Sequence, residues 1–360
     1  MKQKMLSIIL SVVLLVTMGI TLSACTGNSE TAAVHVFYYS YSDTYVSSVR
    51  SALGKLLNEQ GISYQDYDSN ANQTTQTEQV QTAITKGAKA VLVNIVNTGS
   101  DDASAGIVTL AKNAGIPVVF FNREVSDAVV KSYDKCAFVG TDASESGHLQ
   151  GEMIGEYVRD HFQEMDINGD GKISYVLFKG EEGNNEAVLR TRYAVEDANK
   201  VLSKADLPKL SFYDASNPNG YLVDRNGQWS AAAANEYMTT ALASYNEKNK
   251  NAIELVICNN DGMAEGAISA LGAAGYNTGE TGSRTIPVFG VDATDAAKEL
   301  IKKGKMTGTV KQDAVGMAQA LVHLAQNGLS GKDLLEDTDD YHIDEDVDKV
   351  RIAYSKYLGE

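Results

Sequence analysis

Short apolar segments alternate with amphipathic segments along most of this chain, and this alternation limits the fold more than any other feature. Near-continuous apolar runs are typical of strands buried on both faces, which occur in parallel sheets covered by helices. The alternation occurs twice in series and begins again at residue 174. It therefore predicts an α/β fold of two doubly wound, parallel-sheet lobes. The expected strands are 34–39, 62–67, 90–95, 117–121, 135–139, 174–178, 209–215, 254–258 and 288–291.

Amphipathic helices are expected between these strands. In the first of them, Val46, Val49 and Leu53 recur at helical spacing, and Gly61 ends the pattern. Helices at these places would cover both faces of each sheet. The expected helices are 45–60, 77–86, 103–113, 185–205, 229–246 and 263–274.

The first residues have the composition of an export signal. Positive charge precedes an apolar stretch at 6–20, which is too short for a comfortable membrane span. The segment Leu-Ser-Ala-Cys that ends at Cys25 has the pattern of a lipobox. We expect a signal peptide over residues 1–24, lipid on Cys25 and a flexible tether over residues 25–33. An ordinary signal peptide with an incidental cysteine is the alternative.

The composition indicates a soluble, exported protein. Most of the 360 residues remain once the signal is set aside, which is enough chain for two domains. The net charge of −16 opposes binding to nucleic acid, because the phosphates would be repelled. Beyond the lipobox, only Cys136 and Cys258 remain, each in an apolar segment. We expect two buried thiols there, and a disulfide between them is the alternative.

Polar residues follow several of the expected strands. Asp43 comes after the first strand, Asn122 after the strand 117–121, and Asp292 after the strand 288–291. Polar segments at 180–185 and 259–261 follow two more strands. In open α/β sheets, ligands bind outside the carboxyl ends of the strands. The sequence therefore predicts a receptor with a polar cleft between its two lobes.

A series of short motifs occurs between His35 and Tyr354. The motifs are PVVFFN at 117–122, VGTD at 139–142 with ESG at 145–147, DINGDG at 166–171, the alanine-rich segment 229–242, NND at 259–261, PVFGVD at 287–292 and GTV at 308–310. In their order and separations these motifs resemble the galactose/glucose-binding proteins of bacterial sugar ABC transporters, which are type 1 periplasmic binding proteins.

This resemblance implies a multi-strand hinge between the lobes. The first lobe would contain residues 34–141 and 312–347, and the second would contain residues 142–311 and 348–360. The chain would cross between the lobes near Thr141, near Gln312 and before Tyr354, and the lobes would close on a bound sugar.

The resemblance also implies a sugar site. In that family, one aromatic ring from each lobe packs on a flat face of a pyranose, while polar groups bind its hydroxyls. Tyr45 and Trp229 would supply the rings. The polar groups would be Asp43, Asn122, Asn184, Glu186, Arg190, Asn260, Asp292 and Gln312.

Four positions depart from the family pattern. Asn184 replaces His, Glu186 replaces Asp, Gln312 replaces Asn, and Tyr45 replaces the usual Phe. The site stays polar, but its preferred epimer and anomer are left open.

Residues 166–174 have the ligand spacing of a calcium-binding loop. Gly171 stands at the sharp turn, while the twelfth position holds Leu177 in place of the usual Glu. The family resemblance supplies Glu254 as a further acidic ligand and implies a structural role for calcium. A solvated turn is the alternative. The expected ligands are Asp166, Asn168, Asp170, the carbonyl of Lys172, Ser174 and Glu254.

Together these features predict a monomeric, exported solute-binding lipoprotein and not an enzyme. It would capture glucose or galactose and deliver it to the permease subunits of an ABC transporter, with the membrane contacted through lipid alone. A pentose ligand, or a sensor that presents sugar to a chemoreceptor or a membrane kinase, stays open.

Two further alternatives are less favoured. A LacI-type repressor would need a basic helix-turn-helix where this chain has an export signal. A glycosidase would use Asp43 and Glu186 as its carboxylate pair, but both neighbour amides, which favours hydroxyl recognition.

Overall fold

The computed structural model describes residues 32–359. The expected signal peptide, Cys25 and nearly all of the tether lie outside the described residues. Within residues 32–359, no helix has the length and apolar character needed to cross a membrane.

The first sheet has seven strands in the order β12-β13-β5-β4-β3-β1-β2. All neighbouring strands are parallel except β12, which runs antiparallel to β13. The buried strand residues alternate between two cores, so that Val36 packs on one face and Phe37 on the other. The strands are β1 (Val34–Tyr38), β2 (Tyr64–Asp68), β3 (Ala90–Val93), β4 (Val118–Phe121), β5 (Cys136–Gly140), β12 (His342–Ile343) and β13 (Lys349–Arg351).

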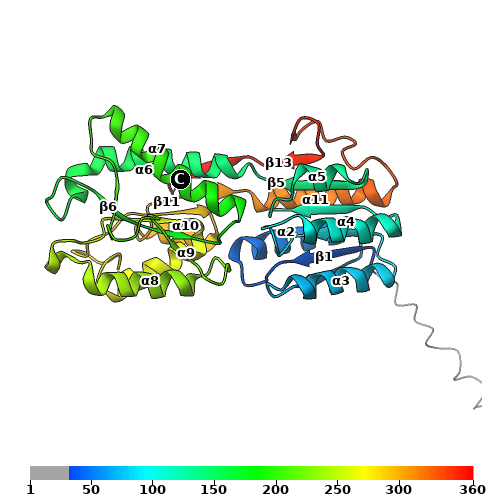
Figure 1. The fold of residues 1–360 in the computed structure, drawn as a ribbon, viewed down its shortest axis with the longest axis horizontal. Helices are drawn as coiled ribbons and strands as arrows, with labels where there is room; N and C mark the ends of the chain where they lie inside the picture. Colours follow the sequence, from blue (N-terminus) through cyan, green and yellow to red (C-terminus); the bar gives the residue numbers. More distant parts are fainter. Residues whose placement is uncertain (1–31, 360) are drawn as a thin grey trace, which may run out of the picture. The chain divides into compact units, whose positions relative to one another are not determined.

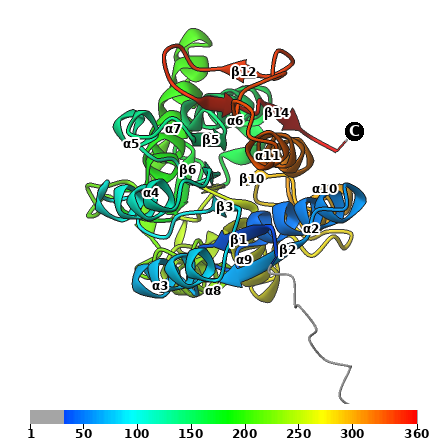
Figure 2. The same cartoon turned by 90° about the vertical axis from the view of Figure 1, so that its right-hand side faces the viewer.

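Helices cover both faces of this sheet, as Figure 2 shows. Helices α3, α4 and α5 pack on one face, while α2 and α11 pack on the other. The bounds are α2 (Thr44–Glu59), α3 (Gln73–Thr85), α4 (Asp102–Ala114), α5 (Asp127–Lys131) and α11 (Ala314–Leu329).

The second sheet repeats this plan (Figure 1). Its order is β14-β11-β10-β9-β6-β7, with β8 paired to β6, and only β14 runs antiparallel to its neighbour. The strands are β6 (Ser174–Lys179), β7 (Ser211–Phe212), β8 (Leu222–Val223), β9 (Leu255–Cys258), β10 (Val288–Asp292), β11 (Gly308–Gln312) and β14 (Tyr354–Tyr357).

Helices α6 and α7 pack on one face of the second sheet, and α8, α9 and α10 pack on the other. The predicted class, two doubly wound α/β lobes, is therefore confirmed. The bounds are α6 (Ala143–Met165), α7 (Asn185–Lys204), α8 (Ala231–Ser244), α9 (Asp261–Ala273), α10 (Asp295–Lys302) and the short 3₁₀ helix η1 (Glu247–Asn249).

The chain crosses between the two lobes at three places: between β5 and α6, between β11 and α11, and between β13 and β14. Two predicted boundaries need correction. Residues 349–351 were assigned to the second lobe, but β13 pairs with β5 and extends the first sheet. Gln312 was assigned to the first lobe, but it ends β11 in the second sheet. The pairing of β13 with β5, and of β14 with β11, joins strands that are distant in sequence, so local patterning does not show where the chain changes sheet.

Several elements were not expected from the sequence. Helix α6 is largely polar, and it packs closely on α7 because Gly147 and Gly151 have no side chain. A Cβ on Gly151 would lie 2.4 Å from the carbonyl oxygen of Tyr193. Helix α8 begins two residues later than expected, so Trp229 precedes the helix and its N-cap Ser230.

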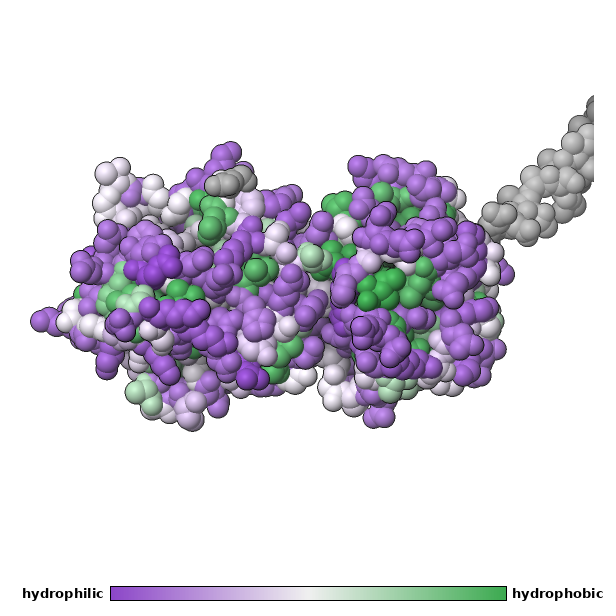
Figure 3. Space-filling view, turned by 90° about the horizontal axis from the view of Figure 1, so that it is seen from above, coloured by the Kyte–Doolittle hydropathy of each residue, from purple (hydrophilic) through white to green (hydrophobic). Residues whose placement is uncertain are grey.

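Both remaining cysteines are buried free thiols, Cys136 in the first sheet and Cys258 in the second, as expected. The face drawn in Figure 3 is mostly hydrophilic, with hydrophobic residues in small scattered areas. Within residues 32–359, large hydrophobic side chains are exposed only at Val188, Val315 and Leu358.

Candidate ligand-binding site

A small cavity lies where the carboxyl ends of strands from both sheets meet. The structure brings together all the residues predicted for the sugar site and adds Tyr39 and Arg123. The lining residues are Tyr39, Asp43, Tyr45, Asn122, Arg123, Asn184, Glu186, Arg190, Trp229, Asn260, Asp292 and Gln312.

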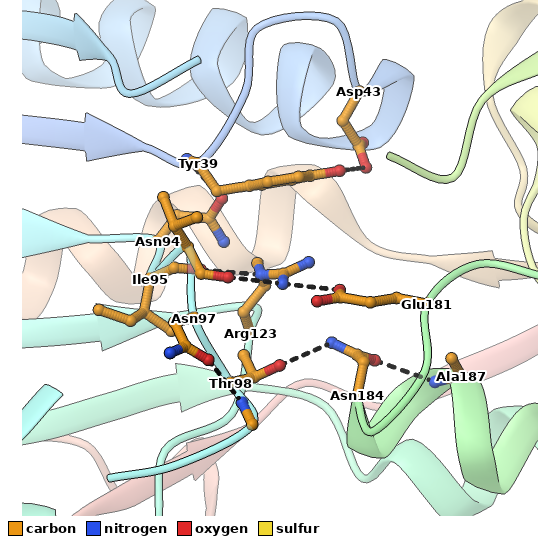
Figure 4. Close-up of polar contacts among 12 residues, drawn as sticks. Tyr39, Asp43, Asn94, Ile95, Asn97, Thr98, Arg123, Glu181, Asn184 and Ala187 are labelled. Atoms are coloured by element: carbon orange, nitrogen blue, oxygen red, sulfur yellow. Dashed lines mark hydrogen bonds and ion pairs between the residues drawn. The ribbon is translucent and has the colours of Figure 1, made fainter. Parts of the chain in front are cut away.

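Asp43 is held from two sides in the first lobe. It is the N-cap of α2, where its Oδ1 accepts a hydrogen bond from the amide of Val46 at 2.9 Å. Its Oδ2 accepts a hydrogen bond from the Tyr39 hydroxyl at 2.6 Å (Figure 4). Asp43 is therefore a fixed hydrogen-bond acceptor at the cavity.

Two asparagines of the second lobe are also helix N-caps. The Oδ1 of Asn184 accepts from the amide of Ala187 at 3.0 Å, and the Oδ1 of Asn260 accepts from the amide of Met263 at 2.9 Å. Each amide nitrogen also donates one hydrogen within the protein, Asn184 Nδ2 to Thr98 Oγ1 at 3.4 Å and Asn260 Nδ2 to the Trp229 carbonyl at 3.3 Å. The second hydrogen of each amide is left to donate at the cavity.

Arg190 of α7 is the central cation of the cavity. Its guanidinium donates to the carbonyl of Asn259 at 2.8 Å, to Gln312 Oε1 at 3.2 Å and to the Tyr354 hydroxyl at 2.8 Å. Burial raises the pKa of Asp292 well above its ordinary range, and the charge of Arg190 opposes that rise. Burial likewise raises the pKa of Glu186, again opposed by Arg190.

The two aromatic rings come from different lobes. Tyr45 in α2 is buried, and its hydroxyl lies 3.6 Å from Met317 Sδ. Trp229 lies before α8 with a left-handed φ of 55°. Its ring packs so closely on Gly180 that a Cβ there would lie 2.0 Å from Trp229 Cδ2.

Unpaired donors and strained backbone gather at this cavity. Trp229 Nε1 and Gln312 Nε2 are buried without a hydrogen-bond acceptor among the residues described. A buried donor without an acceptor costs about 1–3 kcal/mol, so a ligand with oxygen acceptors would stabilise both. Asn122 and Asp292 join Trp229 in having positive φ angles, 60° and 131°. Such strain clusters at binding sites.

Sequence reasoning missed Tyr39 and Arg123. Tyr39 directly follows β1, and Arg123 directly follows Asn122. Their positions at the carboxyl ends of β1 and β4 were the available signal, because Asn122 and Asp292 also lie at strand ends.

The predicted calcium loop folds as a tight turn between α6 and β6. The Asp166 carboxylate accepts hydrogen bonds from the amides of Asp170 at 3.1 Å and Gly171 at 2.9 Å. Glu254 reaches the same loop, where its two oxygens accept from the amides of Asn168 at 3.0 Å and Ser174 at 2.8 Å. The acidic groups therefore lie at one loop, as the family resemblance implies.

The donor chemistry of this loop suits calcium, because calcium prefers several oxygen ligands. Burial raises the pKa of Glu254, and Asp166 adds to that rise, so a cation would relieve the repulsion. The side chains of Asn168 and Ser174 instead bond to the backbone of Ala252. Within residues 32–359, no three His, Cys, Asp or Glu side chains form a metal-binding group. Calcium would therefore depend on amide, hydroxyl and carbonyl oxygens as well.

Two α/β lobes with a polar cavity between them, lined from both sides, define a solute-binding protein. Residues 34–333 match the family described as "Periplasmic binding protein domain", and the chain belongs to this family. The family is one of solute-binding proteins, not of enzymes.

Named relatives cover most of the chain. The D-galactose/methyl-galactoside binding periplasmic protein MglB of Haemophilus influenzae is 36% identical over 306 residues, which is 85% of this chain and 84% of that protein. The D-xylose-binding periplasmic protein of Escherichia coli is 27% identical over 270 residues, which is 75% of this chain and 69% of that protein.

Solved structures share the fold. A solute-binding protein of an ABC transporter from Bacillus halodurans, with bound myo-inositol, is 25% identical with a TM-score of 0.67, covering 93% of this chain and 96% of that chain. One from Clostridium phytofermentans, with bound β-D-glucose, is 19% identical with a TM-score of 0.68, covering 91% of this chain and 94% of that chain.

Proposed function

We propose that this protein is an exported receptor that binds glucose or galactose and delivers it to the permease subunits of an ABC transporter. The lining of the cavity carries the proposal. An aromatic ring from each lobe is surrounded by carboxylate, amide and guanidinium groups. Aromatic faces suit the C–H groups of a pyranose, and the polar groups suit its hydroxyls.

The relatives support a sugar ligand and differ in the sugar named. The Haemophilus relative is named for D-galactose and methyl galactosides, and the Escherichia relative for D-xylose. The higher identity of the first favours a hexose. Glu186 and Gln312, each one methylene longer than the usual family residue, would adjust the choice between glucose and galactose.

Calorimetric titration of the full-length protein with glucose, galactose, methyl galactoside, xylose, ribose and myo-inositol tests the proposal. We expect glucose or galactose to bind at least about tenfold more tightly than either pentose, a difference of about 1.4 kcal/mol. Tighter binding of xylose or ribose would contradict the proposal that the ligand is a hexose. Binding of none of these compounds would contradict the proposal that the protein binds a sugar.

We further propose that Cys25 carries a lipid that anchors the protein to the outer face of the cell membrane. The lipobox pattern that ends at Cys25 supports this. The substitution Cys25→Ser should release the protein into the soluble fraction. An intact-mass spectrum of the wild type with an unmodified Cys25 would contradict lipid anchoring.

A structural calcium ion in the loop 166–174, with Glu254, is also proposed. An ion that binds only the native state stabilises it by about 2.7 kcal/mol at a concentration about a hundredfold above its Kd. EDTA should therefore lower the melting temperature of the wild type and of Asp160→Ala, which removes an exposed carboxylate on α6. The variant Asp170→Ala should lose this sensitivity. A wild-type melting temperature that EDTA does not change would contradict the proposal of a bound calcium ion.

A further inference from the structure

The side chain of Arg123 is clamped within the first lobe (Figure 4). Its Nε donates to the carbonyl of Ile95 at 2.8 Å, and its Nη2 donates to the carbonyl of Val96 at 2.9 Å. The guanidinium also lies over the ring of Tyr39, with 4.3 Å between Cζ and the ring centroid. The same Tyr39 donates its hydroxyl to Asp43, so Arg123 and Asp43 share one neighbour in the first lobe.

The second hydrogen of Arg123 Nη2 is directed across the cleft. It is donated to Glu181 Oε2 at 2.8 Å, in the segment between β6 and α7 of the second lobe (Figure 4). The Arg123 side chain is 6% exposed and that of Glu181 is 23% exposed. A weaker bond crosses beside it, from Asn184 Nδ2 to Thr98 Oγ1 at 3.4 Å.

The remaining nitrogen of Arg123, Nη1, has no acceptor among residues 32–359, while Arg123 lines the cavity. Arg123 therefore has donors bonded to the first lobe, one donor bonded to the second lobe, and two unpaired hydrogens on Nη1 at a residue that lines the cavity. Neither lobe alone supplies all the hydrogen-bond acceptors of Arg123.

We propose that Arg123 is a further ligand-recognition residue that couples sugar binding to lobe closure, because it offers Nη1 to a sugar hydroxyl while Glu181 holds the same guanidinium from the opposite lobe. This inference rests on the proposed function. A bound sugar excludes water from the cleft, and the lower local dielectric strengthens the Arg123–Glu181 attraction. The pair in turn favours the closed geometry in which the sugar is enclosed.

The neighbouring residue Glu182 provides a matched control. It pairs with Lys179 at 2.7 Å and accepts from the Tyr221 hydroxyl at 2.8 Å, both within the second lobe. Glu181 and Glu182 therefore share a loop and a charge, but of the two only Glu181 forms an ion pair with the first lobe. Replacing either one changes the net charge equally.

The test compares Glu181→Ala, Glu181→Gln and Glu182→Ala in the full-length protein. Sugar affinity is measured by calorimetry, and dissociation is measured by stopped flow with the fluorescence of Trp229, the sole tryptophan. We expect Glu181→Ala to weaken binding about tenfold through faster dissociation, because a hydrogen bond to a charged group is lost. Glu181→Gln should fall between this variant and the wild type, and Glu182→Ala should stay within about twofold of the wild type. Equal effects of Glu181→Ala and Glu182→Ala would overturn the coupling.

Arg123 itself is tested by Arg123→Lys, alone and with Glu181→Ala. Lysine keeps the charge and loses the planar fork, so we expect weaker binding and an altered preference between glucose and galactose. The double variant should lose less affinity than the product of the single losses. Independent losses, or an unaltered preference, would overturn the role of Arg123.

Small-angle scattering without ligand separates this inference from the proposed function. If the wild type bound no sugar, the proposed function would fail, yet the Arg123–Glu181 pair would still favour closed lobes and predict a larger radius of gyration for Glu181→Ala than for Glu182→Ala. Equal radii for these two variants would overturn the role of this pair in closure even in a protein that binds sugar.

Discussion

Trp229 shows how far the conformation of one residue decides this site. Its left-handed backbone ends the segment before α8 and directs the indole to the cavity, so the ring lies outside the helix in which its sequence pattern placed it. Gly180 permits this position, because any larger residue would occupy the space of the ring. The position of the Trp229 ring at the cavity thus depends on Gly180, which is distant in sequence.

The substitution Gly180→Ala should displace the indole and weaken sugar binding by about two- to tenfold, since stacked aromatic contacts are worth about 0.5–1.5 kcal/mol beyond their burial. Calorimetry and the emission of Trp229 measure the effect. The control is Gly272→Ala in α9, where a Cβ would meet no atom within 4 Å. Wild-type affinity in Gly180→Ala would show that the ring does not support the ligand.

Asp261 predicts a pH dependence of stability. It is fully buried, where its oxygens accept from the Thr309 hydroxyl at 2.7 Å and the Thr294 amide at 2.8 Å. Burial raises its pKa to about 7, above the value of about 3.9 in an unfolded chain. Folding therefore favours the protonated carboxyl. Its contribution to the free energy of unfolding is complete below about pH 4 and is lost as the pH rises through about 7.

The free energy of unfolding should accordingly fall more steeply between pH 4 and pH 7 in the wild type than in Asp261→Asn, by at most about 1.4 kcal/mol per pH unit. Urea denaturation at several pH values measures both slopes. The comparison of slopes tolerates a constant loss of stability in the variant. If the free energy of unfolding fell equally with pH in the wild type and in Asp261→Asn, a group other than Asp261 would cause the pH dependence.

At the scale of elements, the ends of helices build much of the site. Asp43, Asn184 and Asn260 each cap a helix that follows a parallel strand, so the same side chain ends the loop and faces the cavity. Helix capping fixes which atom of each amide is left for a ligand. Each of these side chains therefore both caps a helix and faces the ligand cavity.

Two substitutions of Asn260 separate these roles. Serine is also a good N-cap but lacks the amide donor, so Asn260→Ser should lose sugar affinity with little change in stability. Asn260→Ala should lose the same affinity and about 1 kcal/mol of stability in addition. Calorimetry and urea denaturation provide the two measurements. Equal stability of the two variants would show that the cap contributes nothing to α9.

At the scale of the whole protein, the three crossings meet near the cavity. Tyr354 at the third crossing bonds through its hydroxyl to Thr141 Oγ1 at the first crossing, at 2.8 Å. The same hydroxyl accepts from Arg190, which also donates to Gln312 at the second crossing. The segments that link the lobes are therefore in direct contact with a cavity residue, so a ligand can bias the angle between the lobes.

We expect the bound sugar to shift the lobes from an open to a closed arrangement, because neither lobe alone supplies both aromatic rings. Small-angle scattering should show a smaller radius of gyration with sugar than without it. Calorimetry on the same sample confirms occupancy. An unchanged radius at full occupancy would contradict closure as the signal to a permease.

The sequence by itself determined the two α/β lobes and most of the cavity lining. Hydrophobic periodicity is a local property that follows each strand and helix, and polar residues at strand ends converge in any parallel sheet. Only the tertiary structure decided which sheet β13 joins, that Trp229 leaves its helix, and that Arg123 meets Glu181. These features depend on partners far apart in the chain, and on close packing that excludes all but one arrangement, neither of which has a local pattern.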